Sequence, residues 1–215
     1  MTTEAPPKAR RNRPHTEAKL RAAVETLLAK GGFAALTPTA VGKQAGVDKM
    51  LIYRYFGDLK GLVEAVARGP DFFPSLEDIC GGDPIAFRRA AIPERLAAVF
   101  SNFAEVLMRR PSVVEMMVWE LVERNELTAI METAREEMGM RIAAELFPDA
   151  PSDNRTRAIA ALLSAGVNYL VLRRRKIRWY NGVDLKSEEG WRDLHEAMHL
   201  MARAVAPDRA PRPCA

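Results

Sequence analysis

The sequence has little cysteine and no long apolar run. Two cysteines in 215 residues, Cys80 and Cys214, are too few for a disulfide framework and favour a reducing compartment. The most apolar stretch, residues 158–172, is interrupted by two polar residues, whereas a bilayer-spanning helix takes about 20 apolar residues. Residues 1–13 are polar and basic, without the apolar segment of a secretory signal. We therefore expect a cytoplasmic chain without a membrane partner.

Most enzyme motifs are also missing. The sequence has no GxSxG, Cys–His pair or phosphate-cradling glycine loop, and only His195–His199 matches a catalytic pattern, the HExxH of zinc proteases. On a helical wheel, His195 and His199 lie about 90° and 130° from the apolar face of that helix, toward solvent. Asp208, in the tail, is the one downstream candidate for a third ligand. A zinc hydrolase is thus the weaker alternative. We predict that the protein binds no metal or cofactor and is not an enzyme.

The charge is unevenly distributed along the chain. Residues 1–62 carry 11 Lys/Arg against 5 Asp/Glu, and the remainder carries 21 against 23. A basic N-terminal third is typical of a region that binds a polyanion, because phosphate neutralisation supplies most non-specific DNA affinity. A merely basic surface explains the same counts, so both interpretations stay open on charge alone.

Helical periodicity recurs along the whole chain, and no strand-like alternation of useful length interrupts it. The sequence predicts an all-α fold, with a domain boundary at Gly69–Pro70. The expected parts are a basic disordered arm at 1–13, a helix-turn-helix domain at 14–69, a helical ligand-binding and dimerisation domain at 70–206, and a disordered Pro-rich tail at 207–215. Helices are expected at 14–31, 38–46, 48–56, 58–68, 84–90, 93–109, 112–124, 126–147, 152–178 and 187–205.

The stretch from Thr37 to Phe56 has the features of a helix-turn-helix. Thr37 precedes a proline that begins a short helix, Gly46 permits the tight turn, and Asp48 can cap the second helix. Ile52 and Phe56 are spaced to point inward. Four residues are left to face outward toward a major groove: Lys49, Met50, Tyr53 and Arg54.

The run from Gly32 to Phe56 closely resembles the TetR family of transcriptional regulators. The matching marks are Gly32-Phe33, Thr37, Ala45-Gly46-Val47 and Ile52-Tyr53-x-Tyr55-Phe56, followed by Leu62. The resemblance implies an all-helical homodimer, a head that binds a double-stranded DNA operator, and a variable body that binds a small-molecule effector. It also implies phosphate contacts by Thr37 and Tyr55, and base or backbone contacts by Thr39, Lys49, Met50, Leu51, Tyr53 and Arg54.

Two positions depart from the family pattern. Where the family usually has a lysine early in the fourth helix, this chain has Leu59, and we expect Lys60 to substitute for it in the DNA-binding set. Gly42 stands where alanine is common, and a glycine mildly weakens a helix interior.

The last two helices are predicted to form a four-helix dimer bundle. Apolar residues of the last helix follow heptad spacing, and small residues of the preceding helix allow close backbone approach. The alternative is that both helices only complete the intrachain core. The predicted interface comprises Leu162, Ala165, Gly166, Trp191, Leu194, Met198 and Met201.

A ligand pocket is predicted from large, adaptable side chains of the body. Met and aromatic stripes are more often core than pocket, so a packed core is the alternative. The candidate set is Phe103, Met116, Met117, Trp119, Glu120 as a polar anchor, and Tyr169. The resemblance to the TetR family, together with these features, implies a ligand-responsive repressor that binds a palindromic operator as a homodimer. A ligand-binding helical dimer without DNA function is the remaining alternative.

Overall fold

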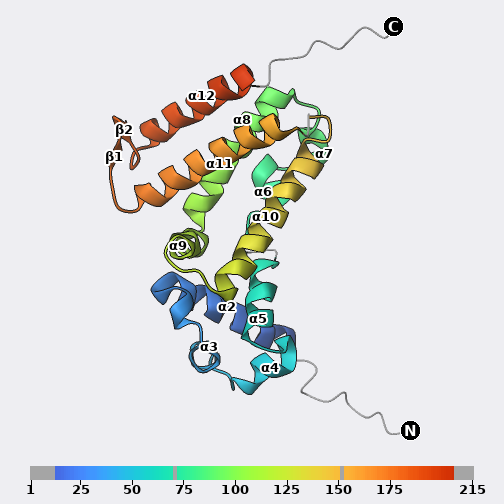
Figure 1. Cartoon of the computed structure of the whole chain (residues 1–215), viewed down its shortest axis with the longest axis vertical. Coiled ribbons are helices and arrows are strands. Elements are labelled where there is room, and N and C mark those ends of the chain that lie inside the picture. The colour runs from blue at the N-terminus through green and yellow to red at the C-terminus, as the bar shows by residue number, and fades with distance from the viewer. Residues whose placement is uncertain (1–12, 70–71, 151–152, 206–215) are drawn as a thin grey trace, which may run out of the picture. The chain divides into compact units, whose positions relative to one another are not determined.

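The computed structural model describes residues 13–69, 72–150 and 153–205, and the chain forms two compact units. Unit 1 comprises the described residues up to Phe73 together with Pro111–Glu136. Unit 2 comprises Pro74–Arg110 and the described residues from Glu137 onward. Helices make up nearly all of the regular structure (Figure 1), which confirms the predicted all-α fold.

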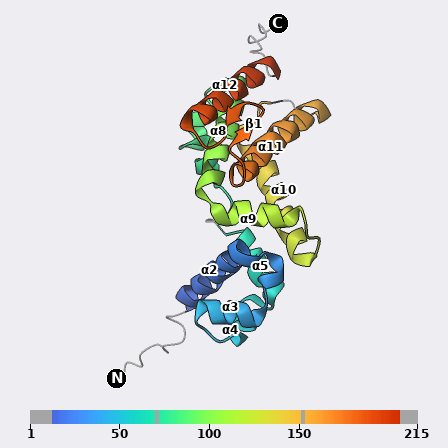
Figure 2. The ribbon, with the colours of Figure 1, turned by 90° about the vertical axis from the view of Figure 1, so that its left-hand side faces the viewer.

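Unit 1 is built around one long helix, α2, which contacts α3, α5 and α9 (Figures 1 and 2). Its buried residues Leu20, Val24 and Leu28 are spaced by four and form one face. Ile52, Leu62 and other apolar residues of the short helices complete this core. The elements of unit 1 are α2 (Arg13–Gly31), the 3₁₀ helix η1 (Phe33–Ala35), α3 (Pro38–Ala45), α4 (Met50–Phe56), α5 (Leu59–Ala67), α9 (Pro111–Glu120) and the first half of α10 (Glu126–Leu146).

Unit 2 is organised around α8, which contacts α6, α11 and α12. Figure 1 shows α8 running beside α11 and α12. Buried residues on α8 include Phe100, Ala104 and Leu107, again at helical spacing. The elements of unit 2 are α6 (Leu76–Cys80), α7 (Pro84–Phe87), α8 (Ile92–Arg109), the second half of α10, α11 (Asn154–Arg174), β1 (Trp179–Tyr180), β2 (Val183–Asp184) and α12 (Glu188–Val205).

A buried arginine fixes the end of α10 within unit 2. The Arg95 side chain is 1% exposed, and its Nη1 donates to the carbonyl of Leu146 at 2.6 Å. Its Nη2 donates to both carboxylate oxygens of Asp149, at 2.7 and 2.6 Å. These hydrogen bonds hold the pKa of the Asp149 carboxyl below its ordinary value. A buried arginine needs such partners, because an uncompensated buried charge is strongly destabilising.

A short hairpin stands where the sequence analysis expects the end of a long helix. α11 ends at Arg174, four residues before the expected end, and an antiparallel pair follows with Trp179 opposite Asp184. Asn181 and Gly182 form its turn with φ of 46° and 84°. This Asn-Gly conformation matches the twist of a two-residue hairpin, which explains why the chain reverses here.

Candidate nucleic-acid interface

Local capping defines α3, the first helix of the helix-turn-helix. The Oγ1 of Thr37 accepts a hydrogen bond from the Ala40 N–H at 3.1 Å, and Pro38 occupies the first helical position. Gly46 ends the helix in the left-handed region, with φ 66° and ψ 34°. These three positions behave as the sequence predicts.

Gly42, at the position where the family commonly has alanine, has a packing role in the structure. It is buried, and a Cβ built on it would lie 3.0 Å from the Val47 carbonyl oxygen and 3.1 Å from the Lys49 nitrogen. The glycine therefore lets α3 approach the backbone that begins the second helix. Glycine is unfavourable in a helix interior, but here it allows the two helices to pack closely.

The second helix, α4, presents a polar and aromatic surface. The Oδ1 of Asp48 accepts from the Met50 N–H at 2.8 Å and fixes the start of the helix, while Ile52 is fully buried beneath it. Met50 and Tyr53 are 59% and 45% exposed, so the outward surface of α4 offers an apolar and an aromatic side chain to a partner. Phe56, expected to point inward, is only half-buried.

The predicted DNA-binding residues lie at the start of α3, along α4 and at the start of α5. Seven are exposed, and Leu51 and Tyr55 are half-buried. Pro38, Tyr53 and Lys60 line one shallow depression of the surface, so the starts of α3 and α5 meet beside α4. The exposed set is Thr37, Thr39, Lys49, Met50, Tyr53, Arg54 and Lys60.

Two arginines accompany Tyr55. The guanidinium carbon of Arg13, at the start of α2, lies 5.2 Å from the centroid of the Tyr55 ring, and that of Arg54 lies 6.0 Å away. The Nε of Arg13 donates to Glu17 at 2.6 Å, one helical turn further on. Arg13 is not one of the predicted DNA-binding residues, although it is the last residue of the basic arm expected at 1–13.

Lys60 lies at the start of α5, where Asp58 caps the helix by accepting from the Gly61 N–H at 2.8 Å. Its Nζ is 2.5 Å from the Oε2 of Glu126, the first residue of α10. This hydrogen bond raises the pKa of the Lys60 ammonium. Leu59, at the position that the family usually gives to lysine, is half-buried. No local sequence signal joins Glu126 to this site, because the two residues are far apart in the chain.

The candidate pocket residues are divided between the two units. In unit 1, Met116 and Met117 are buried on α9, beside the half-buried Trp119 and Glu120. In unit 2, Phe103 is buried on α8, whereas Tyr169 on α11 is 46% exposed. The buried members are also what a packed core would contain.

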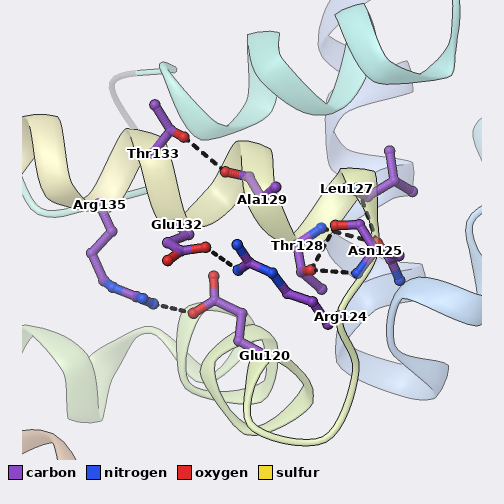
Figure 3. Close-up of polar contacts among 9 residues, drawn as sticks. All are labelled: Glu120, Arg124, Asn125, Leu127, Thr128, Ala129, Glu132, Thr133 and Arg135. Atoms are coloured by element: carbon purple, nitrogen blue, oxygen red, sulfur yellow. Dashed lines mark hydrogen bonds and ion pairs between the residues drawn. The ribbon is translucent and has the colours of Figure 1, made fainter.

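Two polar atoms of α9 are buried without a partner. They are the Oε1 of Glu120 and the Nε1 of Trp119, while the other carboxylate oxygen of Glu120 pairs with Arg135 (Figure 3). Burial raises the pKa of the Glu120 carboxyl, and Arg135 opposes that shift. Buried polar groups without partners are rare in folded proteins and call for an explanation.

All three predicted interface residues of α11 lie on one exposed face of the helix. Leu162 is 74% exposed, and Ala165, Gly166 and Tyr169 are exposed on the same side of the helix. An exposed leucine in such surroundings is a feature of interaction surfaces.

On α12 the predicted interface residues lie on two neighbouring stripes of the helix, one buried and one more exposed. Trp191 and Met198 are 6% and 5% exposed, and the Met198 sulfur lies 4.0 Å from the Oγ of Ser101 on α8. Their side chains therefore belong to the intrachain core, which is the alternative stated for this helix. Leu194 is half-buried and Met201 is 44% exposed, on the neighbouring stripe.

The HExxH segment lies on the same helix. His195 is half-buried, with its ring centroid 6.4 Å from that of Trp191 and its Nε2 shielded without a partner, so its predicted position toward solvent is wrong. It continues the buried stripe of Trp191 and Met198. His199 and Glu196 are exposed. Within the described part of the chain, no three His, Cys, Asp or Glu side chains group as metal ligands would.

Comparison with solved structures finds the same fold over nearly the whole chain. GusR of Salmonella enterica has a TM-score of 0.59 at 18% identity, over 90% of this chain and 96% of that one. The fatty acid degradation regulator FadR of Bacillus halodurans gives 0.58 at 14% identity, over 97% and 100%. FadR of Bacillus subtilis, in complex with stearoyl-CoA, gives 0.57 at 15% identity, over 90% and 99%. At such identities the likeness shows the fold alone.

No curated protein matches the chain. Of the helices in the residues described above, none is both long and apolar enough to cross a lipid bilayer. Residues 20–66, which hold α3, α4 and most of α2 and α5, match the family of bacterial regulatory proteins called the tetR family. This match identifies the helix-turn-helix of residues 20–66 as a domain of the tetR family of bacterial regulatory proteins, in a chain that has the same fold as the solved structures compared above.

Proposed function

We propose that the protein is a ligand-responsive repressor that binds a palindromic operator as a homodimer in the cytoplasm. The observation that carries the DNA-reading part is the outward surface of α4, on which Lys49, Met50, Tyr53 and Arg54 are exposed around the buried Ile52. Lysine and arginine donate to guanine acceptors in the major groove, and Met50 offers apolar contact to thymine methyl groups. Thr37, Tyr55 and Lys60 hold the phosphates, and Thr39 and Leu51 contact base edges or the DNA backbone.

The proposed dimer interface consists of the exposed apolar face of α11 and the stripe of α12 that holds Leu194 and Met201. A regulator with one head per chain reads two half-sites only as a dimer, and a two-fold axis makes the operator palindromic. Leu162 on α11 and Met201 on α12 are 74% and 44% exposed in the single chain, and contact with a second copy would remove both from water.

An effector is supported by the unpartnered atoms of Trp119 and Glu120 on α9, which a polar ligand group would satisfy. A ligand releases a repressor only if its affinity differs between the DNA-bound and free states. Because one protein of similar fold binds stearoyl-CoA, acyl-CoA thioesters are the first compounds to test. An effector of this class would lower operator affinity in a concentration-dependent manner.

The DNA-binding part is tested by selecting bound duplexes from a random library and measuring their affinity by fluorescence anisotropy. We expect an inverted repeat, and a loss of selective binding when Lys49, Tyr53 and Arg54 are replaced by alanine together. The matched control is Arg88→Ala with Arg89→Ala, which removes two exposed cations from unit 2. If no selected duplex binds better than bulk competitor DNA, the proposal fails.

A further inference from the structure

The connection between α9 and α10 is a closely tied polar segment (Figure 3). The Oδ1 of Asn125 accepts from the N–H groups of Leu127 and Thr128 at 2.9 and 3.0 Å, and the Oγ1 of Thr128 accepts from the Asn125 N–H at 2.9 Å. This reciprocal cap fixes the first turn of α10. The direction in which Glu126 leaves the helix is fixed with it.

Two ion pairs brace the same connection from its other side. Glu120 of α9 pairs with Arg135 of α10, and Arg124 of the connecting segment pairs with Glu132 (Figure 3). The Glu120 side chain is only 10% exposed, so its pair is better shielded from solvent than an ordinary surface pair. The first turn of α10 is thus held in place independently of the α5 helix that it contacts.

Glu126 brings an anion to the DNA-binding residues of the head. Its Oε2 is 2.5 Å from the Nζ of Lys60, and the next residue, Leu127, lines the same depression as Tyr53 and Leu59. The second carboxylate near Lys60 belongs to Asp58, whose Oδ1 is already used to cap α5. Glu126 is therefore the carboxylate that neutralises Lys60 in the DNA-free protein.

We propose that Glu126 competes with a DNA phosphate for Lys60, so that the Lys60–Glu126 pair lowers operator affinity and must open when the head docks. This inference rests on the proposed role of Lys60 in DNA binding. The lysine ammonium is a compact point charge. A phosphate brought to the same ammonium lies beside the carboxylate, and the two anions repel each other. DNA binding therefore breaks the Lys60–Glu126 pair, which is a contact between α5 and the first turn of α10.

The size of the effect follows from the exposure of the pair. Lys60 and Glu126 are 51% and 76% exposed, and exposed ion pairs contribute little, so we expect Glu126→Gln to tighten operator binding about 2- to 5-fold per head. Lys60→Gln should weaken binding and reduce the slope of log affinity against log salt by about 1 per head, or about 2 for the dimer. Glu126→Asp, which keeps the negative charge at the helix start but shortens its reach, should give a smaller gain.

The decisive experiment is a double-mutant cycle on the duplex selected from the random library. If Glu126 acts through Lys60, the gain from Glu126→Gln disappears in a Lys60→Gln background. Glu105→Gln is the matched control, because it removes one carboxylate from an exposed pair with Arg109 in unit 2 and should leave affinity unchanged. Thermal melting of each variant checks that the fold is retained.

Two results would overturn the inference while the proposed function stands. One is an unchanged operator affinity in Glu126→Gln. The other is an equal gain in the wild-type and Lys60→Gln backgrounds, which would indicate general repulsion between Glu126 and DNA. A wild-type protein that shows no preference for any selected duplex would instead refute the proposed function itself, and the inference with it.

Discussion

The indole of Trp119, on α9, lies directly against the backbone of Gly32, at the end of α2. A Cβ at position 32 would overlap the five-membered ring of the indole at Cγ and at the two fusion atoms, Cδ2 and Cε2. Gly32 also has φ 64° and ψ −161°, a region that is essentially restricted to glycine. The glycine is thus required twice, once by its conformation and once by a neighbour that is distant in sequence. Gly32 is also one of the positions in which the sequence resembles the TetR family.

Replacing Gly32 by alanine should destabilise unit 1. The expected loss in the free energy of unfolding is about 2 kcal/mol or more, because a strained conformation costs of the order of 1–3 kcal/mol and the displacement of Trp119 adds to it. Chemical denaturation at a fixed protein concentration, followed by tryptophan fluorescence, measures the loss. Gly139→Ala in α10 is the control, since nothing lies within 4 Å of its added Cβ and alanine favours a helix. Equal stability of Gly32→Ala and the wild type would show that the contact with Trp119 is unimportant.

The exposed face of α11 gives a prediction on assembly. Leu162→Glu should shift the protein from dimer to monomer, because a carboxylate buried in an apolar interface loses its hydration. Sedimentation velocity over a range of concentrations measures the shift. Leu121→Glu in unit 1 is the matched control, because Leu121 is 76% exposed, almost the same as Leu162. A dimer that survives Leu162→Glu undiminished would place the interface elsewhere.

Glu120 gives a prediction on pH. Its folded-state pKa is raised above the ordinary value of 4.5, chiefly by burial, so the wild type loses stability as the pH rises from that value through the folded-state pKa. Glu120→Gln keeps an oxygen for Arg135 but cannot ionise. The variant should therefore gain stability relative to the wild type as the pH rises from about 4 to 7. Denaturation of both proteins across this range measures the difference, and a constant or opposite difference would mean that Glu120 is not effectively desolvated.

The helix-turn-helix could be predicted from the sequence because its signals act over a few residues. Thr37, Gly46 and Asp48 each serve a cap or turn within their own helix, and the structure confirms all three. Such caps depend on the backbone next to them, so a single sequence is enough to place them. The Asn181-Gly182 turn is equally local, because an Asn-Gly pair favours a two-residue hairpin turn.

Contacts between distant residues could not be predicted in this way. From the sequence alone, the Lys60 side chain could equally well extend into solvent or pair with Glu126. In the same way, nothing in the sequence indicates that Gly32 contacts Trp119. On α12, heptad spacing identifies an apolar helix but leaves open which stripe packs against the chain's own α8. Packing decides this, and it turns Trp191 inward while Met201 stays exposed.

The split composition of unit 1 has a consequence for synthesis on the ribosome. A nascent chain of 110 residues already holds every element from α2 to α5, yet it lacks α9, and with it the indole that covers Gly32. The head can be completed only after residue 136 has left the exit tunnel. A truncated mRNA that ends before that point would yield a helix-turn-helix whose α2 surface is left uncovered. We expect proteases and chaperones to remove such a fragment before it can act as a repressor.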